Sequence, residues 1–261
     1  MAGASAGWMS CPAPNGTARL RLLCFPHAGG SASIFGGWHR QLPAEIELSC
    51  VQLPGRDGRR GDPPLTDFDA LVAALADALR WHLDVPLVFF GHSMGALIAF
   101  ELARELRRRR LPGPAHLCVS AHRAPHLSPL NPGERPLHRL PDDEFIAELQ
   151  RRYGTTPELA ESAELAELFL PLLRADLALC ETYVFRAEAP LECSISALGG
   201  SDDRRVRRPQ LAAWRQHTAS AFDLRLFPGD HFFARRDPYL LLQALAQQLT
   251  QVARRIPRSR P

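Results

Sequence analysis

The chain has 261 residues, and its content of 46% hydrophobic and 23% charged residues is ordinary for a globular protein with a full hydrophobic core. A formal net charge of +3 is too small to indicate nucleic-acid binding. The longest apolar runs, such as residues 85–90, are too short to span a bilayer. The first residues lack the basic and apolar regions of a secretory signal, so we expect a cytoplasmic protein without membrane contact.

Residues 1–17 are rich in Ala, Gly, Ser and Pro, which predicts a flexible N-terminal tail before one domain over residues 18–261. The six cysteines show no CxxC spacing, so we expect buried free thiols and no metal site. No long apolar surface stripe stands out, and we expect a monomer.

Short apolar runs alternate with helix-like segments through residue 121. The expected strands are residues 20–25, 46–53, 85–90 and 115–121, and the expected helices between them are residues 33–41, 67–83 and 94–110. This alternation predicts right-handed crossovers and a mostly parallel α/β sheet covered on both faces.

The alternation stops between about residues 141 and 186, where only helical patterns occur, at residues 142–153, 157–170 and 172–185. It resumes with strands at 193–198 and 222–227 and helices at 209–217 and 238–255. We interpret the insertion as a helical lid over the functional site. The alternative is that these helices only cover one edge of the sheet.

The most specific motif is Gly-His-Ser-Met-Gly at residues 91–95, between a predicted buried strand and a predicted helix. This context is typical of the nucleophile elbow of α/β-hydrolases, in which Ser93 is the nucleophile. Gly91 and Gly95 leave room for the strained turn, and the turn presents the hydroxyl at the positive end of the helix. The alternative is a glycine-rich turn with a structural serine.

A serine hydroxyl needs a base, and in this fold the acid and then the histidine follow the serine along the chain. His231 lies in a loop directly after a strand and is the preferred base; His217 lies in a helical segment. The strand at residues 193–198 ends in Gly-Gly-Ser-Asp-Asp. We favour Asp203 as the acid from its spacing to Gly200, and interpret Asp202 as a turn residue.

An oxyanion hole requires two N–H donors. One is expected from Met94, the residue after the nucleophile, and the other from Ala28 in the loop after the first predicted strand. The alternative for residues 26–30 is a plain glycine turn.

With these elements in place, the chain resembles the type II thioesterases, the stand-alone editing enzymes of polyketide and nonribosomal peptide synthesis. The resemblance covers residues 20–249. It is carried by residues 25–31 (FPHAGGS), 52–56 (QLPGR), 170–176 (LPLLRAD) and 227–233 (FPGDHFF). The family is similar to the medium-chain thioesterases of animal fatty-acid synthesis, so fatty acyl groups on a carrier protein are an alternative substrate.

The resemblance implies hydrolysis of short or aberrant acyl groups from the phosphopantetheine arm of an acyl or peptidyl carrier protein. Ser93 would attack the thioester, His231 would transfer protons, and Asp203 would orient the imidazole, with no cofactor. An esterase or lipase on the same fold, a chain-terminating thioesterase and a non-catalytic carrier-binding protein are the alternatives.

Carrier proteins are usually acidic, so a basic surface would suit docking. One arginine cluster lies at residues 107–110. Another, made of Arg204, Arg205, Arg207 and Arg208, flanks the loop at residues 199–203, here called the acid loop. The second cluster is the preferred docking hypothesis. The alternative for both is a solvated surface at a helix end. Arg56 is either a substrate contact or the structural partner of an acid.

Overall fold

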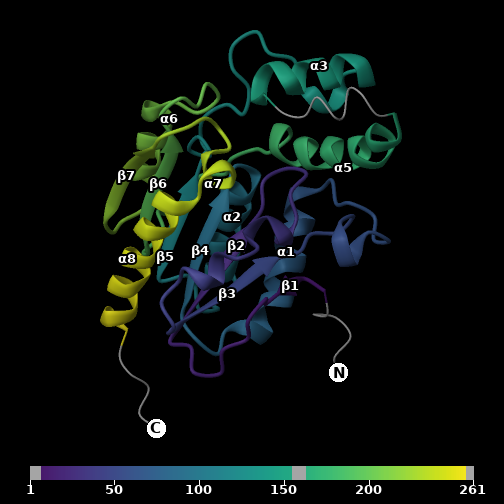
Figure 1. Cartoon of the computed structure of the whole chain (residues 1–261). Coiled ribbons are helices and arrows are strands. Elements are labelled where there is room, and N and C mark those ends of the chain that lie inside the picture. Colours follow the sequence, from purple (N-terminus) through teal and green to yellow (C-terminus); the bar gives the residue numbers. More distant parts are fainter. Residues whose placement is uncertain (1–6, 155–162, 257–261) are drawn as a thin grey trace.

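A seven-stranded sheet forms the centre of the computed structural model, which describes residues 7–154 and 163–256 (Figure 1). The strand order is β1-β3-β2-β4-β5-β6-β7, and every neighbouring pair is parallel except β1 with β3. The strands are β1 (Met9–Ser10), β2 (Leu20–Phe25), β3 (Ile46–Val51), β4 (Leu87–His92), β5 (His116–Ser120), β6 (Ser194–Gly200) and β7 (Phe222–Phe227).

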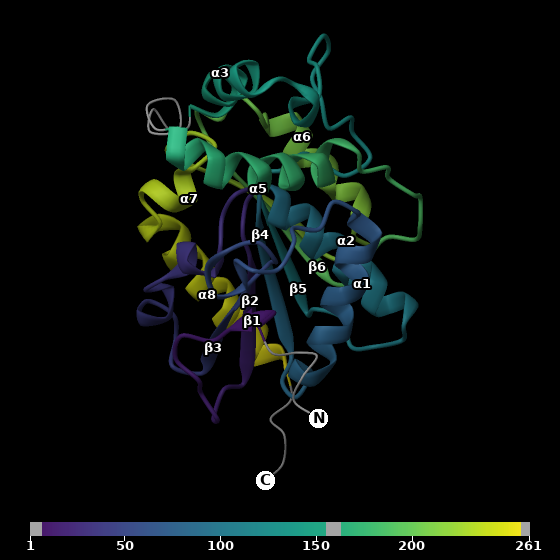
Figure 2. The ribbon, with the colours of Figure 1, turned by 90° about the vertical axis from the view of Figure 1, so that its right-hand side faces the viewer.

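Helices cover both faces of this sheet, as the sequence predicted (Figure 2). Side chains such as Phe25 and Phe89 pack in one cluster with α1 (Phe68–Leu79) and α2 (Met94–Arg108). Their neighbours Cys24 and Phe90 pack in another cluster with α8 (Tyr239–Arg255). Successive side chains of a strand point to opposite faces, so strands of near-continuous apolar sequence fill both layers. The shorter helices are α6 (Arg208–Ala212) and α7 (Phe233–Arg236).

The predicted strands and long helices are confirmed to within a few residues. The segment expected as a helix at residues 33–41 is instead two 3₁₀ turns, Ala32–Phe35 and Trp38–Arg40. Gly36 and Gly37 separate them, and Gly37 has a φ of 83°, which a continuing helix does not allow. The remaining 3₁₀ turns are Asp57–Arg59, Arg80–His82, Leu137–Arg139 and Ala213–His217.

The helical insertion contains α3 (Asp142–Tyr153) and α5 (Ala163–Glu181), which lie side by side above the sheet (Figures 1 and 2). The predicted break at Pro171 is wrong, because α5 continues through this residue. Leucines on both sides of the proline, Leu170 and Leu177, pack in one cluster with Phe145 of α3, and this burial outweighs the lost backbone bond. The predicted helix start at residues 157–162 lies outside the described residues.

Part of the predicted N-terminal tail is packed against the domain. Trp8 is buried, and Met9 and Ser10 pair with β3. The Arg59 guanidinium lies 4.1 Å from the centre of the Trp8 ring. For residues 7–17 these contacts replace the loose tail that composition alone predicted, because the burial of Trp8, the strand pairing and hydrogen bonds of Asn15 to Glu47 and Ala44 hold the segment on the domain. In the described part of the chain, no helix combines the length and apolar character that a membrane crossing requires.

Candidate active site

Ser93 lies at the turn between β4 and α2, and its backbone is in a strained conformation with φ 52° and ψ −119°. The turn is possible only because its neighbours lack side chains. A Cβ on Gly91 would lie 2.1 Å from the carbonyl oxygen of Gly95, and one on Gly95 would lie 2.1 Å from that of Phe25. The geometry therefore matches the nucleophile elbow that the motif predicted.

Three predicted site residues form one hydrogen-bonded chain. The Ser93 hydroxyl lies 3.0 Å from Nε2 of His231, and Nδ1 of His231 lies 2.9 Å from Oδ2 of Asp203. The other carboxylate oxygen of Asp203 accepts the backbone N–H groups of Arg205 and Val206 at 2.7 and 3.1 Å. The two backbone bonds fix the orientation of this carboxylate, so its other oxygen accepts from Nδ1 of the imidazole and the Nε2 lone pair faces the serine.

His92 binds the backbone of the loop that carries His231, a role that the sequence analysis did not predict. Its Nε2 donates to the carbonyl of His231 at 3.0 Å, and its Nδ1 accepts from the Ser120 hydroxyl at 2.9 Å. Burial, with the neighbouring charges of His231 and His27, keeps the pKa of His92 well below its usual value. A permanently neutral ring is what this pair of bonds requires. The only sequence signal for it was its position inside the elbow motif.

Ala28 and Met94 line the same cavity as Ser93. Among the hydrogen bonds of residues 7–154 and 163–256, the backbone N–H groups of Ala28 and Met94 have no acceptor within the protein. Ala28 follows β2 and Met94 begins α2, so both donors come from elements adjacent to the serine. Two unpaired N–H groups beside a nucleophile are suited to stabilise a developing oxyanion.

The cavity beside Ser93 has a volume of about 110 Å³, and the helical insertion forms one of its walls. Residues of α3 and α5 on this wall are Leu149, Tyr153, Leu173, Leu177, Cys180 and Glu181. The Tyr153 ring packs edge-on against the His231 ring, with 5.3 Å between their centres. The insertion thus contacts the candidate base itself, as a lid would, and does not only cover a sheet edge.

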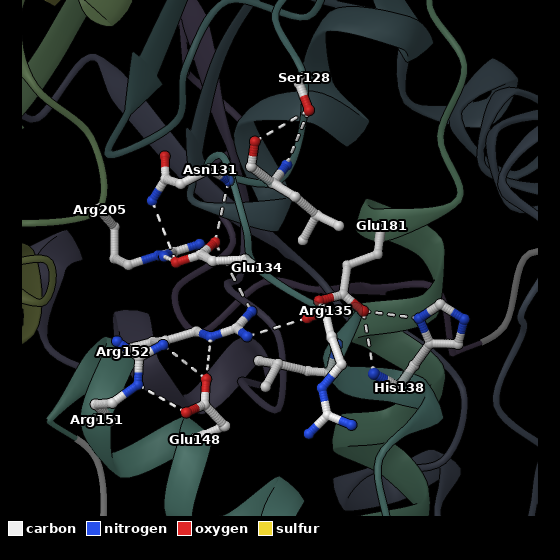
Figure 3. Close-up of polar contacts among 12 residues, drawn as sticks. Ser128, Asn131, Glu134, Arg135, His138, Glu148, Arg151, Arg152, Glu181 and Arg205 are labelled. Carbon is white, nitrogen blue, oxygen red and sulfur yellow. Dashed lines mark hydrogen bonds and ion pairs between the residues drawn. The ribbon is translucent and has the colours of Figure 1, made fainter.

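A network of charged residues ties the acid loop to the insertion (Figure 3). Glu134 forms an ion pair with Arg205, and Arg152 of α3 lies 3.8 Å away from the same carboxylate. Burial raises the pKa of Glu134, but the hydrogen bond and charge of Arg205 outweigh it and lower that pKa to about 2. Arg205 is only 9% exposed and also lies against the Tyr153 ring.

This network corrects the docking hypothesis for one residue. Arg205 is buried and already paired, so it is not available to a partner, whereas Arg204, Arg207 and Arg208 are exposed. The other arginine cluster, at the end of α2, pairs with acids of the chain such as Glu105 and Glu188. The sequence does not predict the pairs with Glu134 and Glu188, because these acids lie 71 positions from Arg205 and 81 positions from Arg107.

The rejected alternatives lie elsewhere. His217 is buried and hydrogen-bonded to His126 at 2.7 Å, and no described contact joins it to Ser93. Asp202 is exposed. Arg56 is the structural partner of an acid, as one alternative predicted, because it forms a buried ion pair with Asp176 of α5.

Comparison with known proteins agrees with this geometry. Residues 20–257 match the family described as "Thioesterase domain". The chain belongs to the thioesterase domain family. The gramicidin S biosynthesis protein GrsT of Aneurinibacillus migulanus is 41% identical over 238 residues, which cover 91% of this chain and 92% of GrsT.

Solved thioesterases share the fold. The RedJ thioesterase from the prodiginine pathway of Streptomyces coelicolor is 39% identical, with a TM-score of 0.83 over 92% of this chain and 95% of RedJ. BorB, a type II thioesterase from the borrelidin biosynthetic cluster, is 36% identical, with a TM-score of 0.81 over 93% of this chain and 96% of BorB. The resemblance to type II thioesterases and the α/β-hydrolase fold are therefore confirmed.

Proposed function

We propose that this thioesterase hydrolyses short or aberrant acyl groups from the phosphopantetheine arm of acyl or peptidyl carrier proteins in polyketide or nonribosomal peptide synthesis. The observation that carries the proposal is the hydrogen-bonded chain Ser93–His231–Asp203 at the wall of a small, mostly apolar cavity. The relatives named in these pathways support the choice of substrate.

In the proposed mechanism, Ser93 Oγ attacks the thioester carbonyl while His231 Nε2 takes the hydroxyl proton. The negative oxygen of the tetrahedral intermediate accepts the N–H groups of Ala28 and Met94. Protonated His231 then gives its proton to the departing pantetheine sulfur, leaving an acyl group on Ser93. A water molecule, deprotonated by His231, attacks this ester, and the imidazole then gives that proton to Ser93 Oγ as the free acid leaves. Asp203 stabilises the protonated imidazole in both halves of the reaction.

The cavity supports a short acyl group as substrate. Its volume is about 110 Å³, and side chains from α5, including Leu173 and Leu177, line it. The exposed Arg204, beside the acid loop, is our candidate for contact with the acidic carrier protein. We expect the enzyme to act as a monomer in the cytoplasm.

The test is mass spectrometry of carrier proteins that bear acetyl and longer acyl groups, incubated with the wild type or with Ser93→Ala. Ser201→Ala is the matched control, because Ser201 is an exposed serine outside the cavity. Loss of the acyl mass with the wild type and Ser201→Ala, but not with Ser93→Ala, is the expected result. Rapid cleavage of oxygen esters with no turnover of any carrier-bound acyl group would refute the proposal in favour of an esterase.

A further inference from the structure

One buried ion pair, Arg56 with Asp176, binds two backbone groups of the loop that carries the Ala28 donor. Asp176 of α5 is 1% exposed and accepts the backbone N–H of Gly29 at 2.7 Å. Arg56, 5% exposed, donates to the carbonyl of Gly30 at 2.9 Å. Each member of the pair therefore binds one backbone group immediately after Ala28.

The two side chains also bind each other in a two-point contact. Both terminal nitrogens of Arg56 lie 2.8 Å from the oxygens of Asp176. Arg56 is itself fixed by the carbonyl of Pro54 at 3.2 Å. A planar guanidinium bound in this way has one orientation, so it fixes the loop after β2 relative to the loop after β3.

Close packing supports the same contact. Gly29 has a φ of 74°, and a Cβ there would lie 2.5 Å from Cδ2 of Leu173, on the turn of α5 before Asp176. A Cβ on Gly55 would lie 3.1 Å from Cδ1 of Leu172. The helix therefore lies directly on both loops, and Leu173 faces the cavity as well.

We propose that Arg56 and Asp176 are positioning residues that set the oxyanion donor Ala28 and fix the C-terminal half of α5 as a permanent wall of the active site. The inference rests on the proposed function, because it takes the Ala28 N–H as an oxyanion donor. Any opening of the insertion then involves α3 and the part of α5 before Leu172. Movement of the C-terminal half would separate a buried ion pair, which is strongly unfavourable.

The pair also has an electrostatic consequence. A lone carboxylate beside the oxyanion hole would oppose the negative charge that develops on the substrate oxygen. Arg56 neutralises Asp176 at 2.8 Å, so the acid orients the loop without this penalty. Removing Arg56 alone is therefore more harmful to catalysis than removing both charges together.

The experiment compares Asp176→Asn, Arg56→Met and the double variant Arg56→Met/Asp176→Leu, using hydrolysis of a short acyl thioester of N-acetylcysteamine. The double variant leaves no unpaired buried charge, so it keeps the test valid if the single variants fold poorly. Asp142→Asn is the matched control, because Asp142 pairs with Arg174 of α5 but does not contact the loop. We expect kcat to fall by about tenfold to a hundredfold in the three test variants with KM nearly constant, most in Arg56→Met, and to stay unchanged in the control.

Inhibitor binding separates positioning from a merely structural role. A short trifluoromethyl ketone forms an adduct with Ser93 that places an oxyanion in the hole, whereas an acyl amide mimics only the bound substrate. Affinity for the ketone should fall in step with kcat, and affinity for the amide should not. Equal losses for both ligands, or a lower Tm with unchanged kcat, would overturn the inference.

Failure of this inference differs from failure of the proposed function. Turnover of the small thioester by the wild type without turnover of acylated carrier protein would refute only the carrier substrate. A wild type that cleaves neither substrate would refute both.

Discussion

The ring of His92 donates from Nε2 to the backbone carbonyl of His231 across 3.0 Å, so one histidine of the elbow fixes the loop that carries the proposed base. The proposed base therefore has two supports: Asp203 binds its ring, and His92 binds its main chain. The second support needs a neutral imidazole, which burial of His92 ensures by lowering its pKa.

Replacing His92 with Leu should lower kcat by about tenfold or more, because the loop and the imidazole of His231 lose their fixed position. The Ser120 hydroxyl would also lose its partner in a fully buried place, at a cost of about 1–3 kcal/mol in the free energy of unfolding. Steady-state kinetics and urea unfolding measure the two effects. His92→Gln keeps a donor of similar reach and should retain more activity than His92→Leu; equal activity of the two would contradict this role.

The two adjacent aspartates of the acid loop should differ sharply. Asp203→Asn should reduce kcat by about 10³–10⁴-fold, because an amide favours the wrong imidazole tautomer. Asp202→Asn should change kcat less than twofold, since Asp202 is exposed and its side chain accepts a hydrogen bond from Ser201. Kinetics of both variants on one thioester decide the assignment, and a larger loss in Asp202→Asn would reverse it.

The fold and the site differ in how far the sequence determines them. Ser93, His231 and Asp203 were predictable, because each follows a strand of clear apolar pattern and strand ends meet at one edge of a parallel sheet. The ion pair of Arg56 with Asp176 joins residues 120 positions apart, and no local pattern specifies which acid an arginine will meet. The burial of Arg205 depends in the same way on distant Glu134. The sequence pattern divided this segment into two helices at residue 171, but packing in the insertion outweighs the local preference of Pro171.

Gly95 and Gly113 should differ strongly in how far substitution by alanine lowers stability. Gly95→Ala should abolish folding or lower the free energy of unfolding by more than about 4 kcal/mol, because its Cβ would meet the Phe25 carbonyl at 2.1 Å and backbone atoms have little room to move. Gly113→Ala should be nearly neutral, since nothing lies within 4 Å of its Cβ position. Soluble yield and the urea midpoint test both. A stable, active Gly95→Ala would contradict the close approach of α2 to β2.

Substitutions at Arg204 and Arg205 should distinguish a residue that contacts the carrier protein from one that stabilises the fold. Arg205→Ala should slow the hydrolysis of carrier-bound and small thioesters equally and lower Tm, because it leaves Glu134 partly unpaired. Arg204→Glu should raise KM for acyl-carrier protein severalfold and leave the small thioester unchanged, if the exposed Arg204 contacts the acidic carrier. Comparing kcat/KM on the two substrates tests both statements. Equal effects of Arg204→Glu on both substrates would exclude docking at this position.

Stability should fall as the pH decreases from about 6.5 toward 4. Burial lowers the pKa of His116, His122 and His217 to about 4 in the folded protein, while the unfolded chain binds these protons near its ordinary pKa of 6.5. The unfolded state therefore holds more protons in this window, so each histidine contributes stability above pH 6.5 that is lost on acidification. The slope is at most about 1.4 kcal/mol per pH unit for each group.

The carboxylates act in a lower window and do not mask this effect. The folded pKa of Glu134 and Glu148 is about 2 against an ordinary value of 4.5, so their contribution is lost only between pH 4.5 and 2. The test is urea unfolding of the wild type and His116→Asn from pH 7 to 5. The slope of the unfolding free energy against pH should be smaller in the variant by the contribution of one histidine. Leu245→Ala, a buried residue that does not titrate, should lower stability equally at every pH. Parallel curves for the wild type and His116→Asn would mean that His116 binds its proton equally in the folded and unfolded states, contrary to its burial among Ser194, Ser196 and Gln248.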